Sequence, residues 1–298
     1  MNRQDCCVQS KWRWGVVLLG FLILLIILVV LPASTENAVW ALSFDGIENY
    51  VEIDSTDIVM GGTDWVSNKT ISVWIKPSLD PGPDFLPELG QLIVGNDSPH
   101  WFGITRAIHD GGDKLWVWNG DGNGTDIVGI EFTPGEWVQI TLVHDGVNLS
   151  AYKNGMLVGS TPSGPTEVPS GGGGDGIIRI GGPGRDDGNA QLYFAGEIDE
   201  VRFWNAVLPQ TTIQNWTYQS ITNAHPDWAD LAAYYKMSDG SGIVLSDDGV
   251  HNRDGLLLGN MDDTNWVPSG AMTDPNPPPT PTATPEFSVN LPLVIREE

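Results

Sequence analysis

The chain has 298 residues, which is enough for one large β-sandwich or two small domains, and its 36 glycines and 13 tryptophans favour short strands joined by turns. Its 38 acidic and 14 basic residues give a net charge of −24. This charge argues against binding to the phosphates of nucleic acids or to anionic lipid, because both need a basic surface, and it suits divalent cations.

The first predicted element is an uncharged apolar run over residues 15–31. Arg3, Lys11 and Arg13 precede this run, so the positive-inside rule places residues 1–14 in the cytoplasm and the rest of the chain outside. As a helix the run covers about 25 Å, which is long for a signal-peptide core and slightly short for a membrane core about 30 Å thick. The sequence therefore predicts an N-terminal hydrophobic helix, as a cleaved signal peptide or a retained transmembrane anchor, and an extracellular or cell-surface location.

Residues 39–267 carry the signals of many short β-strands. Apolar and polar residues alternate there, and turn pairs such as Asp45–Gly46 and Asn154–Gly155 interrupt the alternation. Strands are expected over residues 39–44, 50–53, 70–76, 115–118, 137–144, 149–153 and 156–159. Only residues 208–220 suit a helix. The pattern predicts one all-β domain in which two antiparallel sheets pack as a sandwich or jelly roll.

The most regular strand pattern covers Tyr193–Asn205, where carboxylates alternate with apolar residues. Two motifs precede it: Phe44–Gly46 followed by Tyr50–Val51, and a hairpin that runs from Trp137 to Tyr152–Gly155. In this order the three motifs resemble the opening strand pair, the central hairpin and the closing signature of laminin-G-like domains in the concanavalin A-like lectin family. The resemblance implies a jelly-roll sandwich of two antiparallel sheets.

A last strand pattern over Leu231–Lys236, with turns at Gly240–Gly242 and Asp254–Gly255, ends near Trp266. It resembles the strand pair that often precedes the opening strand in the same family, although here it comes last. We therefore expect it to pair with the edge near Val39–Phe44 and not to form a second domain.

Two aspartates are candidate metal ligands. In the family that the chain resembles, aspartates at the motif positions of Asp45 and Asp199 are associated with calcium, so the resemblance implies a structural Ca²⁺ ion held by both. Calcium needs several oxygen ligands at about 2.3–2.6 Å, which carboxylates and turn carbonyls supply. The alternative is that Asp45 caps a turn and Asp199 points into solvent.

The late strand also resembles the catalytic strand of laminarinase-type glycosidases, which share the sandwich fold. Glu197 and Asp199 match the first half of its pattern of acidic residues. The final glutamate should stand at position 201 or 202, where this chain has Val201 and Arg202. Glu200 points to the opposite face of a regular strand. Because one carboxylate of the catalytic pair is missing, the chain is not expected to be an enzyme.

Three tryptophans are candidate ligand-binding residues. Trp116 and Trp118 are two residues apart and so share one face of a strand, and Trp101 lies in an expected turn. Indole rings that reach solvent can stack on sugar rings. The alternative for all three is burial in the core.

The chain ends in a Pro/Thr-rich linker over residues 272–286 and a hydrophobic tail over residues 287–298. Such a linker and tail are similar to the C-termini of some bacterial exported proteins, where they sort or attach the protein; the alternative is a frayed terminus. Together with the resemblance, the sequence predicts an exported, non-catalytic recognition module at the cell surface. Its partner would be a glycan or a cell-surface protein, with membrane contact only through the N-terminal segment. A glycoside hydrolase and an envelope component without a ligand are the alternatives.

Overall fold

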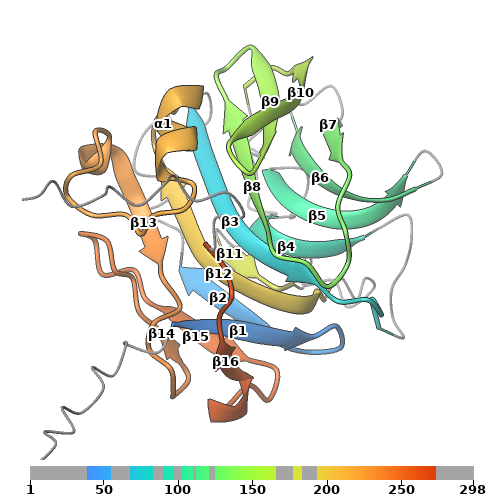
Figure 1. Cartoon of the computed structure of the whole chain (residues 1–298), viewed down its shortest axis with the longest axis vertical. Coiled ribbons are helices and arrows are strands. Elements are labelled where there is room, and N and C mark those ends of the chain that lie inside the picture. The colour runs from blue at the N-terminus through green and yellow to red at the C-terminus, as the bar shows by residue number, and fades with distance from the viewer. Residues whose placement is uncertain are drawn as a thin grey trace, which may run out of the picture. The chain divides into compact units, whose positions relative to one another are not determined.

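The computed structural model describes residues 39–54, 68–82, 90–96, 102–109, 112–120, 125–165, 177–182 and 193–272 (Figure 1). The expected N-terminal helix over residues 15–31, the linker after Met272 and the C-terminal tail lie outside the described residues. In the part of the chain that is described, no helix is long and apolar enough to cross a membrane.

Within these described ranges the strands form two antiparallel sheets of eight strands each. Sheet A contains β1 (Trp40–Asp45), β3 (Lys69–Pro77), β8 (Val138–His144), β9 (Asn148–Lys153), β10 (Met156–Pro162), β12 (Ala195–Trp204), β13 (Leu231–Tyr235) and β16 (Trp266–Pro268). Sheet B contains β2 (Tyr50–Asp54), β4 (Gln91–Asn96), β5 (Phe102–His109), β6 (Gly112–Gly120), β7 (Thr125–Ile130), β11 (Ile177–Ile180), β14 (Val244–Leu245) and β15 (Gly255–Leu258). The described residues also include the short helices α1 (Gln210–Trp216), η1 (Trp228–Asp230) and η2 (Asp263–Asn265), which connect strands.

Strand order places sequence-distant segments side by side. Sheet A runs β10-β9-β8-β3-β12-β1-β16, with β13 also paired to β12, and sheet B runs β14-β15-β2-β11-β4-β5-β6-β7. The late strand β12 therefore lies in the middle of sheet A, between β3 and β1. The outward-facing side chains of β12 therefore contact the segment of the chain that covers the centre of sheet A.

Alternate residues of both sheets point between them and form the core. These include Ile71, Val73 and Ile75 of β3 and Leu115 and Val117 of β6, all of which are fully buried. Because successive side chains of a strand point to opposite faces, the intervening residues face outward. The predicted all-β sandwich of two antiparallel sheets is confirmed in the described residues.

The strands at the end of the domain join both sheets. Trp266–Pro268 pairs with β1, as expected, and Gly255–Leu258 pairs with β2. Leu231–Tyr235 pairs instead with β12. The last part of the chain thus completes the same two sheets.

Residues 205–230, which we call the lid, leave sheet A between β12 and β13 and cover part of its outer face (Figure 1). Leu208 and Ile213 of the lid pack against Trp204 in an apolar cluster separate from the main core. The helix α1 belongs to the lid and is shorter than the expected segment 208–220. The outer face of sheet A is therefore a buried interface at this point.

Candidate functional site

A bulge in β12 decides where its charged residues point. Asp199 pairs with Trp74 of β3, whereas Arg202 pairs with Ser72, so three steps along β12 oppose two along β3. Glu200 takes up the extra residue in a left-handed conformation, with φ of 52°. The bulge brings Glu200 to the side of the sheet that carries Asp199 and Arg202, so the expectation that Glu200 points to the opposite face is wrong.

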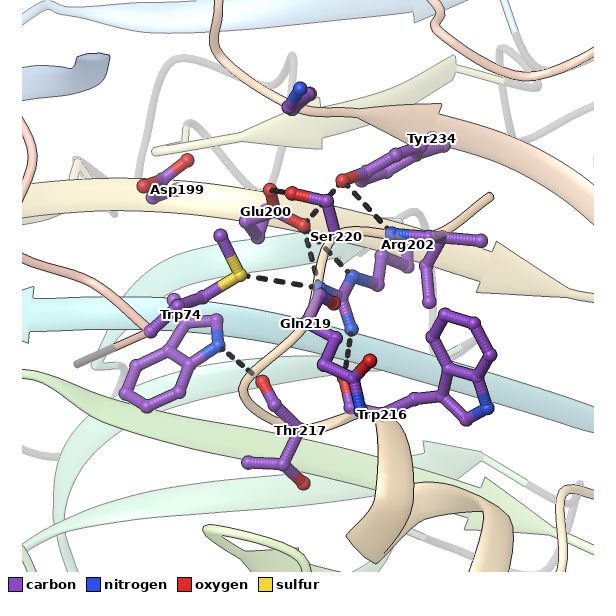
Figure 2. A network of polar contacts seen from close by, with 12 residues as sticks. Trp74, Asp199, Glu200, Arg202, Trp216, Thr217, Gln219, Ser220 and Tyr234 are labelled. Carbon is purple, nitrogen blue, oxygen red and sulfur yellow. Dashed lines mark hydrogen bonds and ion pairs between the residues drawn. The ribbon is translucent and has the colours of Figure 1, made fainter. Parts of the chain in front are cut away.

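Glu200 and Arg202 form a buried ion pair (Figure 2). The Arg202 guanidinium donates to Glu200 Oε2 from Nη2 at 2.6 Å and from Nε at 3.1 Å, and the Tyr234 hydroxyl donates to the same oxygen at 2.6 Å. The two charged side chains are only 2% and 1% exposed. Burial raises the pKa of Tyr234, with the Glu200 charge as the second cause, so the phenol stays a hydrogen-bond donor.

The same arginine holds the lid to sheet A. Its Nη1 donates to the Trp216 carbonyl at 3.0 Å and its Nη2 donates to the Gln219 carbonyl at 2.8 Å. These carbonyls lie at and just beyond the C-terminal end of α1, where carbonyl groups lack partners within the helix. The Trp74 indole adds a bond of 3.1 Å to the Thr217 carbonyl (Figure 2). The cluster around Arg202 is therefore an anchor for the lid.

Asp199 lies beside this cluster and is fully buried. Its Oδ2 accepts a hydrogen bond of 2.5 Å from the Ser269 hydroxyl, and its Oδ1 has no hydrogen-bond partner among the described residues. Burial raises the pKa of Asp199 to about 7. The alternative from the sequence analysis, that Asp199 points into solvent, is therefore wrong.

Asp45 caps a turn at the end of β1. Its Oδ1 accepts from the backbone N–H groups of Ile47, Glu48 and Asn49 at 2.9, 3.0 and 3.1 Å. A side-chain oxygen that binds successive N–H groups in this way stabilises a tight turn. The turn-capping alternative for Asp45 therefore describes what this carboxylate does in the structure.

The structure does not bring Asp45 and Asp199 together. Asp45 lies opposite Ala195 in the β1–β12 ladder, and Asp199 is four residues further along β12. At about 3.3 Å per residue this is roughly 13 Å, too far for both carboxylates to bind one ion at calcium distances. The described residues also contain no group of three His, Cys, Asp or Glu side chains that could hold a metal. The two aspartates therefore do not fit one shared calcium site.

An open groove of about 520 Å³ lies next to Asp45, where β1 and β3 end and β12 begins. Its polar lining consists of Ser43, Asp45, Lys76, Ser78, Asp80 and Glu197. Lys76 Nζ and Glu197 Oε1 are 2.9 Å apart, and both side chains are partly exposed. This groove is the candidate ligand site, because it combines carboxylates, hydroxyl groups and an amine on an accessible surface.

Trp116 and Trp118 lie on the outer face of sheet B, on the same face of β6 as predicted. They are 5% and 8% exposed. Each ring lies on a glycine of the neighbouring strand: a Cβ atom added to Gly129 would lie 2.8 Å from the Trp116 ring, and one added to Gly103 would lie 2.8 Å from the Trp118 ring. Neither indole presents an open face for a sugar. Trp101 lies outside the described residues.

Sequence reasoning missed the partners that neutralise the carboxylates of β12. Arg202 and Tyr234 bind Glu200, and Lys76 binds Glu197. The available signal was the Glu-x-Arg spacing among apolar residues, which predicts a shared face. Nothing local indicated that the lid would bury that face.

Comparison with known proteins gives a family and a fold. The family model described as the concanavalin A-like lectin/glucanases superfamily matches residues 45–214. No curated protein sequence matches the chain.

Several solved structures are similar to the chain. A candidate carbohydrate-binding protein from Bacteroides ovatus has a TM-score of 0.56 and 19% identity, over 74% of this chain and 58% of that protein. A pentraxin from Limulus polyphemus has a TM-score of 0.42 and 16% identity, over 65% and 87%. Domain 4 of an arabinanase from Geobacillus stearothermophilus, solved with arabinotriose, has a TM-score of 0.35 and 18% identity, over 59% and 75%. The chain thus spans little more than half of the first of these proteins, with which it shares the fold.

Proposed function

Because the chain belongs to the concanavalin A-like lectin/glucanase superfamily, we propose that it is a non-catalytic module that binds carbohydrate outside the cell. The apolar run over residues 15–31 supports export. The similar fold of the Bacteroides ovatus protein, which is described as a candidate carbohydrate-binding protein, supports the ligand class. Fold alone does not identify a ligand, so the proposal depends on the site.

The open groove is the observation that carries the proposal. Sugar hydroxyl groups both donate and accept hydrogen bonds, and carboxylates are their strongest acceptors in proteins. Asp80 and Glu197 offer carboxylate oxygens in the groove, and Ser43 and Ser78 are hydroxyl-bearing residues of its lining. A carbohydrate that binds there would lie across the end of β1, the end of β3 and the start of β12.

The burial of β12 carboxylates favours binding without hydrolysis. A retaining glycosidase needs two carboxyl groups about 5–5.5 Å apart on one accessible face. Asp199 and Glu200 are 0% and 1% exposed, and Glu200 is neutralised by Arg202. Of the acidic residues that resemble the glycosidase pattern, only Glu197 lines the groove.

The first test is a glycan array, followed by calorimetric titration of each glycan that binds. Glu197→Gln and Asp80→Asn each remove a charged acceptor from the groove and should weaken binding roughly tenfold or more, because hydrogen bonds to charged groups contribute about 1.5–3 kcal/mol. Asp230→Asn is the matched control, since Asp230 is an exposed carboxylate that does not line the groove. It should bind like the unsubstituted protein.

Two outcomes would contradict the proposal. If no glycan binds on the array, an envelope component without a ligand becomes the better account. If β-1,3-glucan or mixed-linkage glucan is cleaved and Glu197→Gln abolishes the release of reducing ends, the protein is a glycosidase and not a binding module.

A further inference from the structure

A small cavity lies between sheet A and the lid. It is lined by Gln139 and Thr141 of β8, by Trp204 of β12, and by His225 and α1 residues of the lid. The volume of the cavity is about 10 Å³. The four named residues are 1–3% exposed, so each of them is buried where it lines the cavity.

Each of the four residues has a buried polar atom without a hydrogen-bond partner among the described residues. The atoms are Gln139 Oε1, Thr141 Oγ1, Trp204 Nε1 and His225 Nε2. Native proteins rarely leave such atoms unpaired, because each lost hydrogen bond to water destabilises the fold. Four of them around one cavity indicate a common partner inside it.

The backbone fixes which nitrogen of His225 carries the proton. The N–H of Asp227 donates to His225 Nδ1 at 3.1 Å, so Nδ1 is an acceptor and Nε2 carries the hydrogen of the neutral ring. Burial, with the Arg202 charge as the second cause, lowers the pKa of His225 to about 4, so the ring is neutral at physiological pH. His225 Nε2 is therefore a hydrogen-bond donor on a residue that lines the cavity.

The four atoms thus form a complementary set. His225 Nε2 and Trp204 Nε1 are donors, Gln139 Oε1 is an acceptor, and the Thr141 hydroxyl can accept as well. The His225 ring stacks on the Trp204 ring, with centroids 5.5 Å apart and an angle of 29° between the planes, and both residues line the cavity. A molecule that pairs all four atoms accepts hydrogen bonds from the two N–H groups and donates to Gln139 Oε1, and it can donate to the Thr141 hydroxyl as well.

We propose that one buried water molecule occupies this cavity, accepts hydrogen bonds from Trp204 and His225, and donates hydrogen bonds to Gln139 and Thr141. Water is the small neutral molecule with two donors and two acceptors, and buried waters usually make about three bonds to otherwise unpaired groups. An anion would leave Gln139 Oε1 unpaired, and a cation would meet two N–H donors. The water thus links Gln139 and Thr141 of β8 and Trp204 of β12 to His225 of the lid.

A high-resolution crystal structure, with a second crystal soaked in bromide, tests the occupant. The expected result is one oxygen-sized peak about 2.7–3.2 Å from both Trp204 Nε1 and His225 Nε2, with no anomalous bromide signal there. An empty cavity would overturn the proposal, and so would bromide in place of the peak.

Nuclear magnetic resonance tests the same water in solution. The indole N–H signal of Trp204, assigned by its loss in Trp204→Phe, should show a cross-peak to water with the sign of an immobilised molecule. Thr141→Val removes one acceptor and should weaken or abolish that cross-peak, whereas Thr141→Ser keeps the hydroxyl and should retain it. A missing cross-peak in the unsubstituted protein, or one that Thr141→Val leaves unchanged, would refute the proposed set of hydrogen bonds.

Discussion

Replacing Asp199 with asparagine should remove a loss of stability that the unsubstituted protein suffers as pH rises. The unfolding free energy of the variant, relative to that of the unsubstituted protein, should therefore be higher at alkaline pH than at acid pH. Asp199 is fully buried, and the Ser269 hydroxyl donates to its Oδ2. Asparagine keeps the size of the side chain and a carbonyl oxygen for Ser269, but it cannot ionise. The variant therefore isolates the free energy that ionisation of this carboxyl contributes.

The sign and size follow from the pKa of Asp199. Burial raises it to about 7, from an ordinary value of 3.8. Between these values the folded state holds a proton that the unfolded state releases, so the stability of the unsubstituted protein falls as pH rises, by up to about 1.4 kcal/mol per pH unit. Between about pH 5 and pH 8.5 the free energy of unfolding should fall by about 2–3 kcal/mol because of this group alone.

Urea unfolding of both proteins across this pH range, in the presence of EDTA, measures the effect. The difference in unfolding free energy between Asp199→Asn and the unsubstituted chain should grow with pH, while Asp230→Asn, at an exposed carboxylate, should show no such trend. A difference that does not depend on pH, or that shrinks as pH rises, would refute the reasoning. A repeat with calcium tests Asp199 as a metal ligand, because a bound ion would remove the pH-dependent difference.

Three further effects can be measured by the same unfolding method. Arg202→Met leaves the Glu200 carboxylate buried without its cation and should cost about 3–5 kcal/mol; adding Glu200→Gln should recover part of this loss, and no recovery would contradict the ion-pair account. Gly103→Ala places a Cβ atom 2.8 Å from an indole ring and should cost about 1–3 kcal/mol, whereas Gly112→Ala, whose Cβ meets only a flexible lysine side chain at 3.4 Å, should cost less. Because burial lowers the pKa of His225 to about 4 from 6.5, the unfolded state binds more protons between these values and stability should rise with pH there; His225→Gln should flatten this rise.

Local pattern was sufficient for the class of fold and for the faces of single strands. The alternation around Ile71, Val73 and Ile75 predicted a strand, and the spacing of Trp116 and Trp118 predicted that they share a face. Both predictions depend only on the two-residue period of an extended chain. The prediction from this two-residue period was wrong for the direction of the Glu200 side chain, because the bulge interrupts the alternation there.

The bulge, the ladder register and the lid depend on contacts between residues far apart in the chain. Pairing with β3 allows Asp199 and Arg202 to oppose Trp74 and Ser72, with one extra residue between them. In a regular strand Arg202, three residues after Asp199, would point into the core. Because of the bulge, its guanidinium instead meets Glu200 and the carbonyls of the lid.

Composition, turns and alternation thus determined that this chain forms an extended, antiparallel β-structure, because these are properties of neighbouring residues. Tertiary structure alone decided that Asp45 and Asp199 lie apart, that Glu200 is buried, and that Glu197 remains in an open groove. The physical reason is that the partner strand sets the position of a side chain along a ladder, and the lid sets whether that side chain is covered. Neither contact can be predicted from the residues next to that side chain in the sequence.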